Sequence, residues 1–274
     1  MMNEIVRKSA VAGMFYPKNP ETLKKMINDF LEKTKSPDTY ENIFGLISPH
    51  AGYIYSGYSA AFAFNTIIDK NIDTVIIISP SHHDYFQGIS VYSGDFYETP
   101  IGRIAIDKEL RELFISSSNN LFASDLGHRN EHAVEVQIPF LQEVLSQFKI
   151  LPVVIGDQRR KFLDELSIKI ANCYKPKTLV IASSDLSHFY SKEMADKLDS
   201  IVEERINDFD FEELQSDLEN QNCEACGGGA IVSLMKSANL LGFTKSKVLS
   251  RTDSGDVSGD NSSVVGYLSA VIYN

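Results

Sequence analysis

The chain has 274 residues, of which 43% are hydrophobic and 23% charged, and its formal net charge is -11. This apolar content is enough for a hydrophobic core, whereas no Lys- or Arg-rich run offers the positive surface that a nucleic-acid binder needs against phosphates. Because the apolar runs are far shorter than the roughly 20 residues of a membrane helix, the composition predicts a soluble protein with neither a nucleic-acid partner nor a membrane segment.

Short β-branched runs alternate with amphipathic stretches from residue 20 to the end of the chain. The first helix is predicted from Pro20, where Leu23, Met26, Ile27 and Phe30 form an apolar stripe at helical spacing. Strands are predicted at residues 43–48, 74–79, 89–93, 150–155, 178–182 and 264–273. Further helices are predicted at residues 57–68, 108–115, 134–148, 160–173, 191–207, 211–221 and 228–238.

This alternation is typical of βαβ units, so we expect an α/β fold with three layers, α/β/α, and a mostly parallel central sheet. No Pro/Gly/Ser-rich linker divides the sequence, and residues 1–274 are therefore expected to form a single domain. The Gly/Ser/Asp-rich tract at residues 253–263 leads directly into the last predicted strand. We expect it to be a structured loop at the edge of the sheet.

Two of the predicted strands end in proline, which is followed by histidine directly in one and after a single serine in the other. Residues 44–53 read FGLISPHAGY and residues 74–84 read TVIIISPSHHD, which places His50 and His82 just beyond a strand. A residue before proline is disfavoured in the helical region, so each strand should end abruptly with an imidazole at its tip. One such histidine most simply caps a helix or bonds a carbonyl, but two at the carboxyl ends of parallel strands favour a metal or proton-transfer site.

A third strand runs into the same kind of segment, since residues 178–188 read TLVIASSDLSH. Asp185 lies three residues before His188 and could orient that imidazole or share a proton with it. The alternative for Asp185 is a helix N-cap. We therefore predict His188 and Asp185 as catalytic groups, His188 for proton transfer and Asp185 for its orientation or charge.

Two further histidines are predicted to support the site. His83 follows His82 directly, and adjacent side chains leave an extended backbone in opposite directions, so His83 should face the surroundings of the site or a substrate. His132 precedes a predicted helix and is a weaker candidate of the same kind. Its neighbour Glu131 could simply complement the helix dipole, and His128 in the preceding loop is weaker still.

Cys226 opens a run of three glycines before an apolar helix, so we expect it at a helix N-terminus, where the macrodipole favours the thiolate. With Cys223 it forms a CxxC pair, but a structural zinc site needs a second pair, which the sequence lacks. A redox dithiol and two buried thiols remain the alternatives. With Cys173 the cysteines are odd in number, and residues 1–12 are too polar for a signal peptide, which together predict a reducing, cytoplasmic location.

Two histidines with one anionic ligand are the arrangement of mononuclear non-haem iron sites, and a thiolate as third ligand also suits copper or zinc. The same pocket could instead bind a peptide or small anion without catalysis, because histidines and a helix N-terminus also attract anions. Hydrolysis by a serine or cysteine nucleophile is less favoured, because the sequence contains no nucleophile-elbow motif.

Several motifs in order carry a family resemblance: AGMFYP at residues 12–17, SPHAGYIYSG at 48–57, PSHH at 80–83, EHAVEVQIP at 131–139 and SSVVGY at 262–267. Over nearly its whole length the chain resembles the Memo-like family, which is similar in fold to the catalytic subunit of class III extradiol dioxygenases. By that resemblance His50, His82 and Cys226 are metal ligands for iron or copper, with zinc less favoured. His188 and Asp185 stand beside them.

The dioxygenases have a carboxylate where this chain has Cys226, and a thiolate is softer and donates more charge, which argues against ring cleavage. Cys223 is additional to the family pattern, so no role is carried over to it. Prokaryotic relatives are associated with radical-SAM proteins, which implies a functional link to such a partner. The leading hypothesis is thus a cytoplasmic metal-binding protein, which as an enzyme would be a non-haem oxidoreductase acting on an unknown small molecule or protein.

Overall fold

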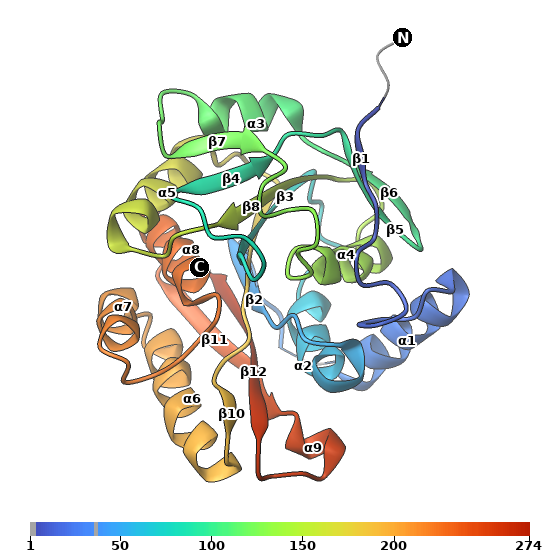
Figure 1. The fold of residues 1–274 in the computed structure, drawn as a ribbon, viewed down its shortest axis with the longest axis vertical. Coiled ribbons are helices and arrows are strands. Elements are labelled where there is room, and N and C mark those ends of the chain that lie inside the picture. Colours follow the sequence, from blue (N-terminus) through green and yellow to red (C-terminus); the bar gives the residue numbers. More distant parts are fainter. Residues whose placement is uncertain (1–3, 36–37) are drawn as a thin grey trace.

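Nine strands form the central sheet of the computed structural model, which describes residues 4–35 and 38–274 (Figure 1). Their order is β10-β12-β2-β9-β3-β8-β4-β7, with β11 also paired to β12. The predicted strands correspond to β2 (Gly45–Ser48), β3 (Thr74–Pro80), β4 (Ile89–Tyr92), β8 (Lys149–Ile155), β9 (Thr178–Ser183) and β12 (Val264–Tyr273). The expected α/β architecture is therefore present.

The sheet is mixed, which corrects the expectation of a mostly parallel one. The strands β2, β9, β3 and β8 are parallel to one another, whereas β12 runs antiparallel to β2 and β4 antiparallel to β8. A parallel connection needs a crossover of a dozen or more residues, and the segment 81–88 between β3 and β4 is too short for one. The chain therefore reverses direction after β3.

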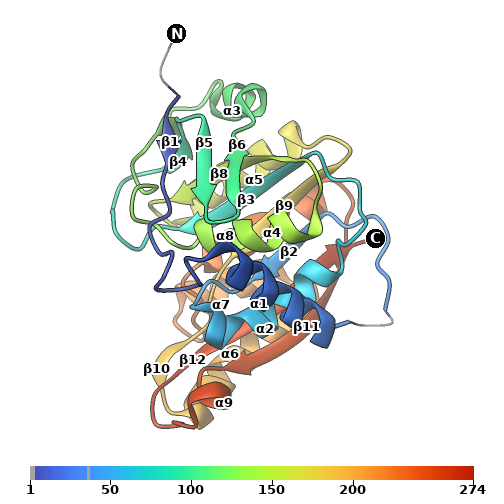
Figure 2. The same cartoon turned by 90° about the vertical axis from the view of Figure 1, so that its right-hand side faces the viewer.

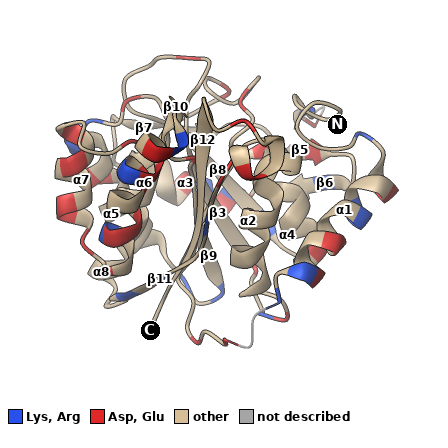
Figure 3. Ribbon diagram, turned by 90° about the horizontal axis from the view of Figure 1, so that it is seen from below, with Lys and Arg blue, Asp and Glu red and all other residues tan. Residues whose placement is uncertain are grey.

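Helices cover both faces of the sheet, which makes three layers (Figure 3). One face carries α3 (Lys108–Ile115), α5 (Arg160–Cys173), α6 (Lys192–Asn207), α7 (Phe211–Glu219) and α8 (Gly228–Leu240), and the other carries α1 (Pro20–Lys33), α2 (Tyr53–Asn65) and α4 (Ile138–Val144). Side chains of β3 alternate between these layers: Ile76 and Ile78 pack in the core on the α5 and α8 side, and Val75 and Ile77 in the core on the α2 side.

Most predicted helices are present, but their first and last residues differ from the prediction where the sequence lacks a clear capping residue. α2 begins at Tyr53, four residues before the prediction, because its apolar residues surround the whole helix and hide its start. The helix predicted at residues 134–148 is a 3-10 turn, η1 (Glu135–Gln137), followed by a short α4. The tract at residues 253–263, expected to be a loop, contains the helix α9 (Gly255–Ser258).

Among the residues that the structure describes, six strands were not predicted: β1 (Val6–Arg7), β5 (Phe96–Thr99), β6 (Gly102–Ala105), β7 (Leu121–Ser124), β10 (His188–Tyr190) and β11 (Lys245–Asp253). Of these, β1, β5 and β6 form a separate three-stranded sheet that lies near α1 and α4 (Figure 2). In it, β1 pairs with β5, a partner 90 residues away. Within the described parts of the chain, no helix is both long and apolar enough to cross a membrane.

Candidate metal site

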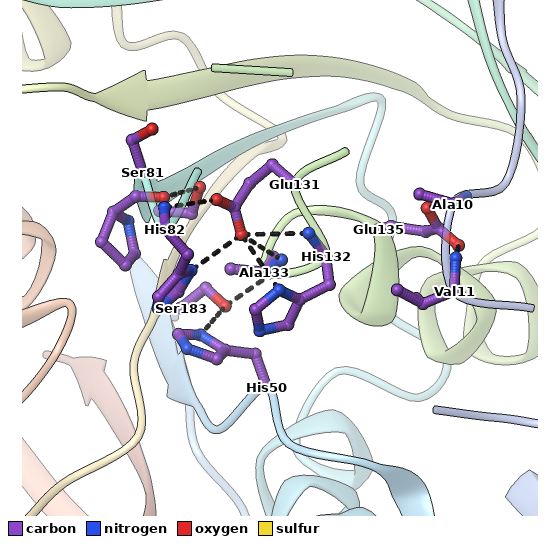
Figure 4. A network of polar contacts seen from close by, with 12 residues as sticks. Ala10, Val11, His50, Ser81, His82, Glu131, His132, Ala133, Glu135 and Ser183 are labelled. Carbon is purple, nitrogen blue, oxygen red and sulfur yellow. Dashed lines mark hydrogen bonds and ion pairs between the residues drawn. The ribbon is translucent and has the colours of Figure 1, made fainter. Parts of the chain in front are cut away.

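Three imidazoles meet beyond the carboxyl ends of β2 and β3. His50 follows β2, His82 follows β3, and His132 comes from the segment that joins β7 to η1 (Figure 4). Their ligand atoms all lie within 4.8 Å of one another, so this group could hold a metal ion. The ring centroids of His82 and His132 are 4.7 Å apart, and that of His50 lies 5.1 Å from His82 and 5.3 Å from His132.

Glu131 holds two of these histidines with one buried carboxylate, which lies between them in Figure 4. Its Oε2 accepts the backbone N–H of His82 at 2.7 Å, and its Oε1 lies 2.9 Å from His82 Nδ1. Oε1 also accepts the backbone N–H groups of His132 and Ala133, each at 3.0 Å. Because Glu131 accepts at His82 Nδ1, the Nε2 of His82 is left free to face an ion.

Charge on Glu131 is favoured despite its burial. Burial alone would raise its pKa, but the hydrogen bonds and positive charge of His82, with the backbone N–H groups, lower the pKa to about 2. The reverse balance holds for His82, where burial lowers the pKa but the bond to Glu131 raises it above its usual value. Glu131 is thus a carboxylate over the whole physiological pH range, which fixes the hydrogen-bonded nitrogen of His82.

His50 is held in a single tautomer by Ser183. The Ser183 hydroxyl donates to the Ala133 carbonyl at 2.7 Å and accepts from the Gln137 side chain at 2.8 Å. A hydroxyl has one proton to donate, so at His50 Nδ1, 2.9 Å away, it must accept. The Nε2 of His50 therefore carries a lone pair, and this atom lies 3.1 Å from Cys226 Sγ.

Full burial, followed by the charge of His82, lowers the pKa of His50 to about 3. Burial followed by the charge of His50 lowers the pKa of His132 to about 4. Both imidazoles are therefore neutral near pH 7, which is the form that binds metal ions. The sequence predicted His132 only as a supporting residue, but the structure brings it into the group of three.

Cys226 stands beside this group, at the residue before the Gly227 N-cap of α8, as expected. Its burial, followed by the charge of Asp185, raises the pKa of the thiol. Both effects act against the helix dipole, which was expected to favour the thiolate. The α8 N-terminus also offers little to an anion, since Gly227 N–H donates to Ser184 Oγ at 2.9 Å and Gly229 N–H to Gln158 Oε1 at 2.7 Å.

Asp185 is buried and connects His50 with Cys226. Its Oδ1 accepts the backbone N–H of His50 at 2.7 Å, and its own backbone N–H points to Cys226 Sγ at 3.3 Å. It does not cap a helix, because the chain enters β10 there. His188 Nδ1 lies 2.8 Å from the Leu186 carbonyl, so this carbonyl orients the imidazole where the sequence suggested Asp185.

His188 and Cys226 both line a cavity of about 910 Å³, to which His50, His82 and His132 contribute no lining. Cys223 lines the same cavity. Its side chain is almost fully buried and belongs to the hydrophobic core that contains residues of α7 and α8. His83 is exposed, and its ring centroid lies 6.4 Å from that of His132. His128 is buried away from the group, with Nδ1 2.8 Å from the Tyr97 hydroxyl.

Sequence reasoning missed the parts that Glu131 and Ser183 play. Glu131 was read as a residue that could simply complement a helix dipole, and Ser183 was not singled out for a role at His50. One signal was present: a Glu directly before a His in the EHAVEVQIP segment. The contacts of Ser183 with His50 and of Glu131 with His82 join residues distant in sequence, so these two contacts follow from the fold.

Comparison with known proteins finds similar proteins along nearly the whole chain. A family model described as Memo-like protein matches residues 7–271. A MEMO1 family protein of Nitrosopumilus maritimus is 37% identical over 96% of this chain and 98% of its own length. A MEMO1 family protein of Methanocaldococcus jannaschii is 38% identical over 99% of this chain and its own full length. The crystal structure of an uncharacterized protein of Escherichia coli K12 matches the fold with a TM-score of 0.55 at 11% identity, over 84% of this chain and 99% of that one.

Proposed function

Because this chain belongs to the Memo-like protein family and gathers three imidazoles beside a thiol, we propose that it binds a redox-active transition metal, iron or copper. The observation that carries the proposal is the hydrogen bonding of His50 and His82. Ser183 and Glu131 occupy their Nδ1 atoms, which leaves Nε2 of each imidazole as the ring nitrogen available to an ion. A carboxylate or hydroxyl behind each imidazole is the usual support of histidine ligands in metalloproteins.

We propose His50, His82 and Cys226 as the ligands. The Sγ of Cys226 already lies 3.1 Å from His50 Nε2, and a cation would replace the thiol proton there. His132 is the competing third ligand, because its ring belongs to the group whose ligand atoms lie within 4.8 Å. A set of imidazoles with a thiolate suits copper or iron, and zinc is less favoured on the family resemblance.

The bound metal would supply redox chemistry or polarise a substrate. The chain's own residues have separate tasks in this proposal. His188 lines the 910 Å³ cavity and would move a proton between that cavity and solvent, and Asp185 would hold the His50 backbone in place. The dioxygenase-like character of the fold belongs to the same proposal, with Cys226 in place of a carboxylate arguing against ring cleavage.

Metal content tests the proposal directly. The protein is purified without chelators and measured by plasma mass spectrometry beside the His50→Ala and His82→Ala variants. We expect stoichiometric iron or copper in the wild type and its loss in both variants. The control is His83→Ala, which changes an exposed histidine and should keep the metal. Equal metal in the wild type and in a variant lacking both His50 and His82 would overturn the proposal.

A further inference from the structure

Arg7, in the short strand β1, lies with its guanidinium buried against the segment that carries Glu131 and His132. Its Nε donates to the carbonyl of His128 at 3.0 Å, and its Nη2 donates to the carbonyl of Glu131. Its Nη1 forms an ion pair with Glu135 Oε2. The Arg7 side chain is 4% exposed. One side chain therefore contacts this segment at three points along its length.

Glu135 completes the connection from the other side, as Figure 4 shows with Ala10 and Val11. Its carboxylate accepts the backbone N–H groups of Ala10 at 2.8 Å and Val11 at 3.2 Å, and it accepts the hydroxyl of Tyr16. Glu135 is fully buried. Residues 7–16, which include all of the AGMFYP motif except Pro17, are thus fastened to residues 128–135 by buried, charged hydrogen bonds. We call residues 7–16 the N-terminal strap.

The strap reaches the histidines through Glu131. Arg7 donates a hydrogen bond to the Glu131 carbonyl. The Glu131 carboxylate in turn accepts from the backbone N–H and Nδ1 of His82 and from the backbone N–H of His132. From this chain of contacts we infer that Arg7 is a positioning residue for the metal site, acting through Glu131 on His82 and His132. The inference rests on the proposed metal-binding function, but it concerns residues outside the ligand set.

Arginine suits this position for a geometric reason. Its planar guanidinium carries five N–H groups in fixed directions, so it can reach two carbonyls and a carboxylate at once. A lysine ammonium could pair with Glu135 but has a single nitrogen and could not keep both carbonyls in the same places. The exposed pair Lys8 and Glu98, with 2.7 Å between Nζ and Oε1, offers a matched control on the neighbouring residue of the same segment.

The test uses full-length protein and Cu(II) alone as the probe. Arg7→Met combined with Glu135→Gln removes both buried charges together, so that neither is left unpaired. We expect this double variant to keep its circular dichroism spectrum but to bind Cu(II) roughly 10- to 100-fold more weakly, with an altered electron paramagnetic resonance spectrum. Lys8→Met combined with Glu98→Gln should match the wild type in Cu(II) affinity and in its electron paramagnetic resonance spectrum. Wild-type affinity and spectrum in the folded Arg7 double variant would overturn the inference.

If the double variant does not fold, Arg7→Lys decides the question. This variant keeps a positive charge against Glu135, and we expect a folded protein with weaker Cu(II) binding and a changed spectrum. Unchanged Cu(II) affinity and spectrum in folded Arg7→Lys would equally refute the positioning role.

Histidine side-chain ¹⁵N signals of the metal-free protein separate this inference from the proposed function. We expect the signals of His82 and His132 to shift in Arg7→Lys, with that of His188 unchanged. If the wild type binds no Cu(II), the metal proposal fails, but shifted His82 and His132 signals still support the positioning role of Arg7. Unshifted signals would refute that role whether or not the wild type binds metal.

Discussion

Ser183 and His50 form a pair in which the serine hydroxyl determines the tautomer of the imidazole. The Ser183 hydroxyl donates its one hydrogen to a bond with the Ala133 carbonyl, so it accepts at His50 Nδ1 and leaves a lone pair on His50 Nε2. This relation joins the ends of two adjacent parallel strands, since Ser48 of β2 is in register with Ser183 of β9. The availability of His50 for a metal therefore depends on a hydroxyl 133 positions away in sequence.

The first prediction concerns Ser183→Ala. Without the hydroxyl, His50 is no longer held in one tautomer, and we expect Cu(II) affinity to fall by roughly 10- to 100-fold. Stability should fall by about 1–3 kcal/mol, because the Gln137 amide and the Ala133 carbonyl lose a buried partner. Competition titration with a chelator measures the affinity, and urea unfolding measures the stability.

Ser167→Ala is the matched control, since Ser167 is also a buried serine and donates to the Leu163 carbonyl in α5 at 2.7 Å. It should lower stability without changing Cu(II) affinity. If Ser183→Ala binds Cu(II) as tightly as Ser167→Ala, the proposed role of Ser183 is wrong.

The second prediction concerns Glu131→Gln, which keeps the size of the side chain but removes its charge. The amide accepts less strongly at His82 Nδ1, so we expect the metal-free protein to contain both neutral tautomers of His82 where the wild type contains mainly the Nδ1–H form. Histidine ¹⁵N spectra recorded above pH 8 measure the tautomer ratio.

Glu165→Gln serves as the control, because Glu165 accepts from the Ser118 hydroxyl and the Asn120 side chain away from the histidines. The tautomer ratio of His82 should be unchanged in it. An unchanged ratio in Glu131→Gln itself would show that Glu131 does not select the nitrogen.

His50 and His82 could be predicted from sequence because the signal is local. Each follows its strand within a few residues, and the parallel order of β2, β9 and β3 brings the strand ends to one edge. The position of Cys226 was also predictable, because the glycines after it mark the start of α8. In these three cases the neighbouring residues in the sequence mark the end of a strand or the start of a helix, and so define where the side chain lies.

His132 and Glu131 could not be placed in the same way. They lie in an irregular segment whose path is set by Arg7 and Glu135, and those contacts span more than 100 residues. The pairing of β1 with β5 is equally distant, and β1 has only two residues, too few to show a hydrophobic alternation. Sequence patterns report local preference, and here long-range charged contacts decide the path of the chain.

The third prediction identifies the third ligand. If Cys226 binds the metal, the Cu(II) protein should show an intense visible charge-transfer band from sulfur, as in copper sites with a cysteine ligand. The band should disappear in Cys226→Ser and persist in His132→Ala. Absorption spectra of the Cu(II)-loaded variants provide the measurement.

Cys173→Ser controls for sulfur elsewhere, since Cys173 lies at the end of α5, and its band should equal that of the wild type. A wild-type spectrum without the band, combined with a changed resonance spectrum in His132→Ala, would assign the third position to His132. The proposed role of Cys226 would then be wrong, while metal binding by His50 and His82 would stand.

The fourth prediction concerns acid stability and His128. Full burial lowers the pKa of His128 to about 3, whereas an unfolded histidine titrates near 6.5. Between these values the unfolded chain binds the proton and the folded protein does not, so stability falls as the pH falls from about 6.5 toward 3. This residue contributes a slope of up to about 1.4 kcal/mol per pH unit within that window, and none above it.

His128→Gln removes the titrating group, so the free energy of unfolding should depend less steeply on pH between 6.5 and 4 than in the wild type. His50 and His132, with pKa values lowered to about 3 and about 4, keep part of the slope in both proteins. Urea unfolding with a chelator present, at pH 7.5, 5.5 and 4.5, measures the difference. The exposed His83→Gln should retain the wild-type slope, and an equally steep slope in His128→Gln would mean that His128 is protonated in the folded protein.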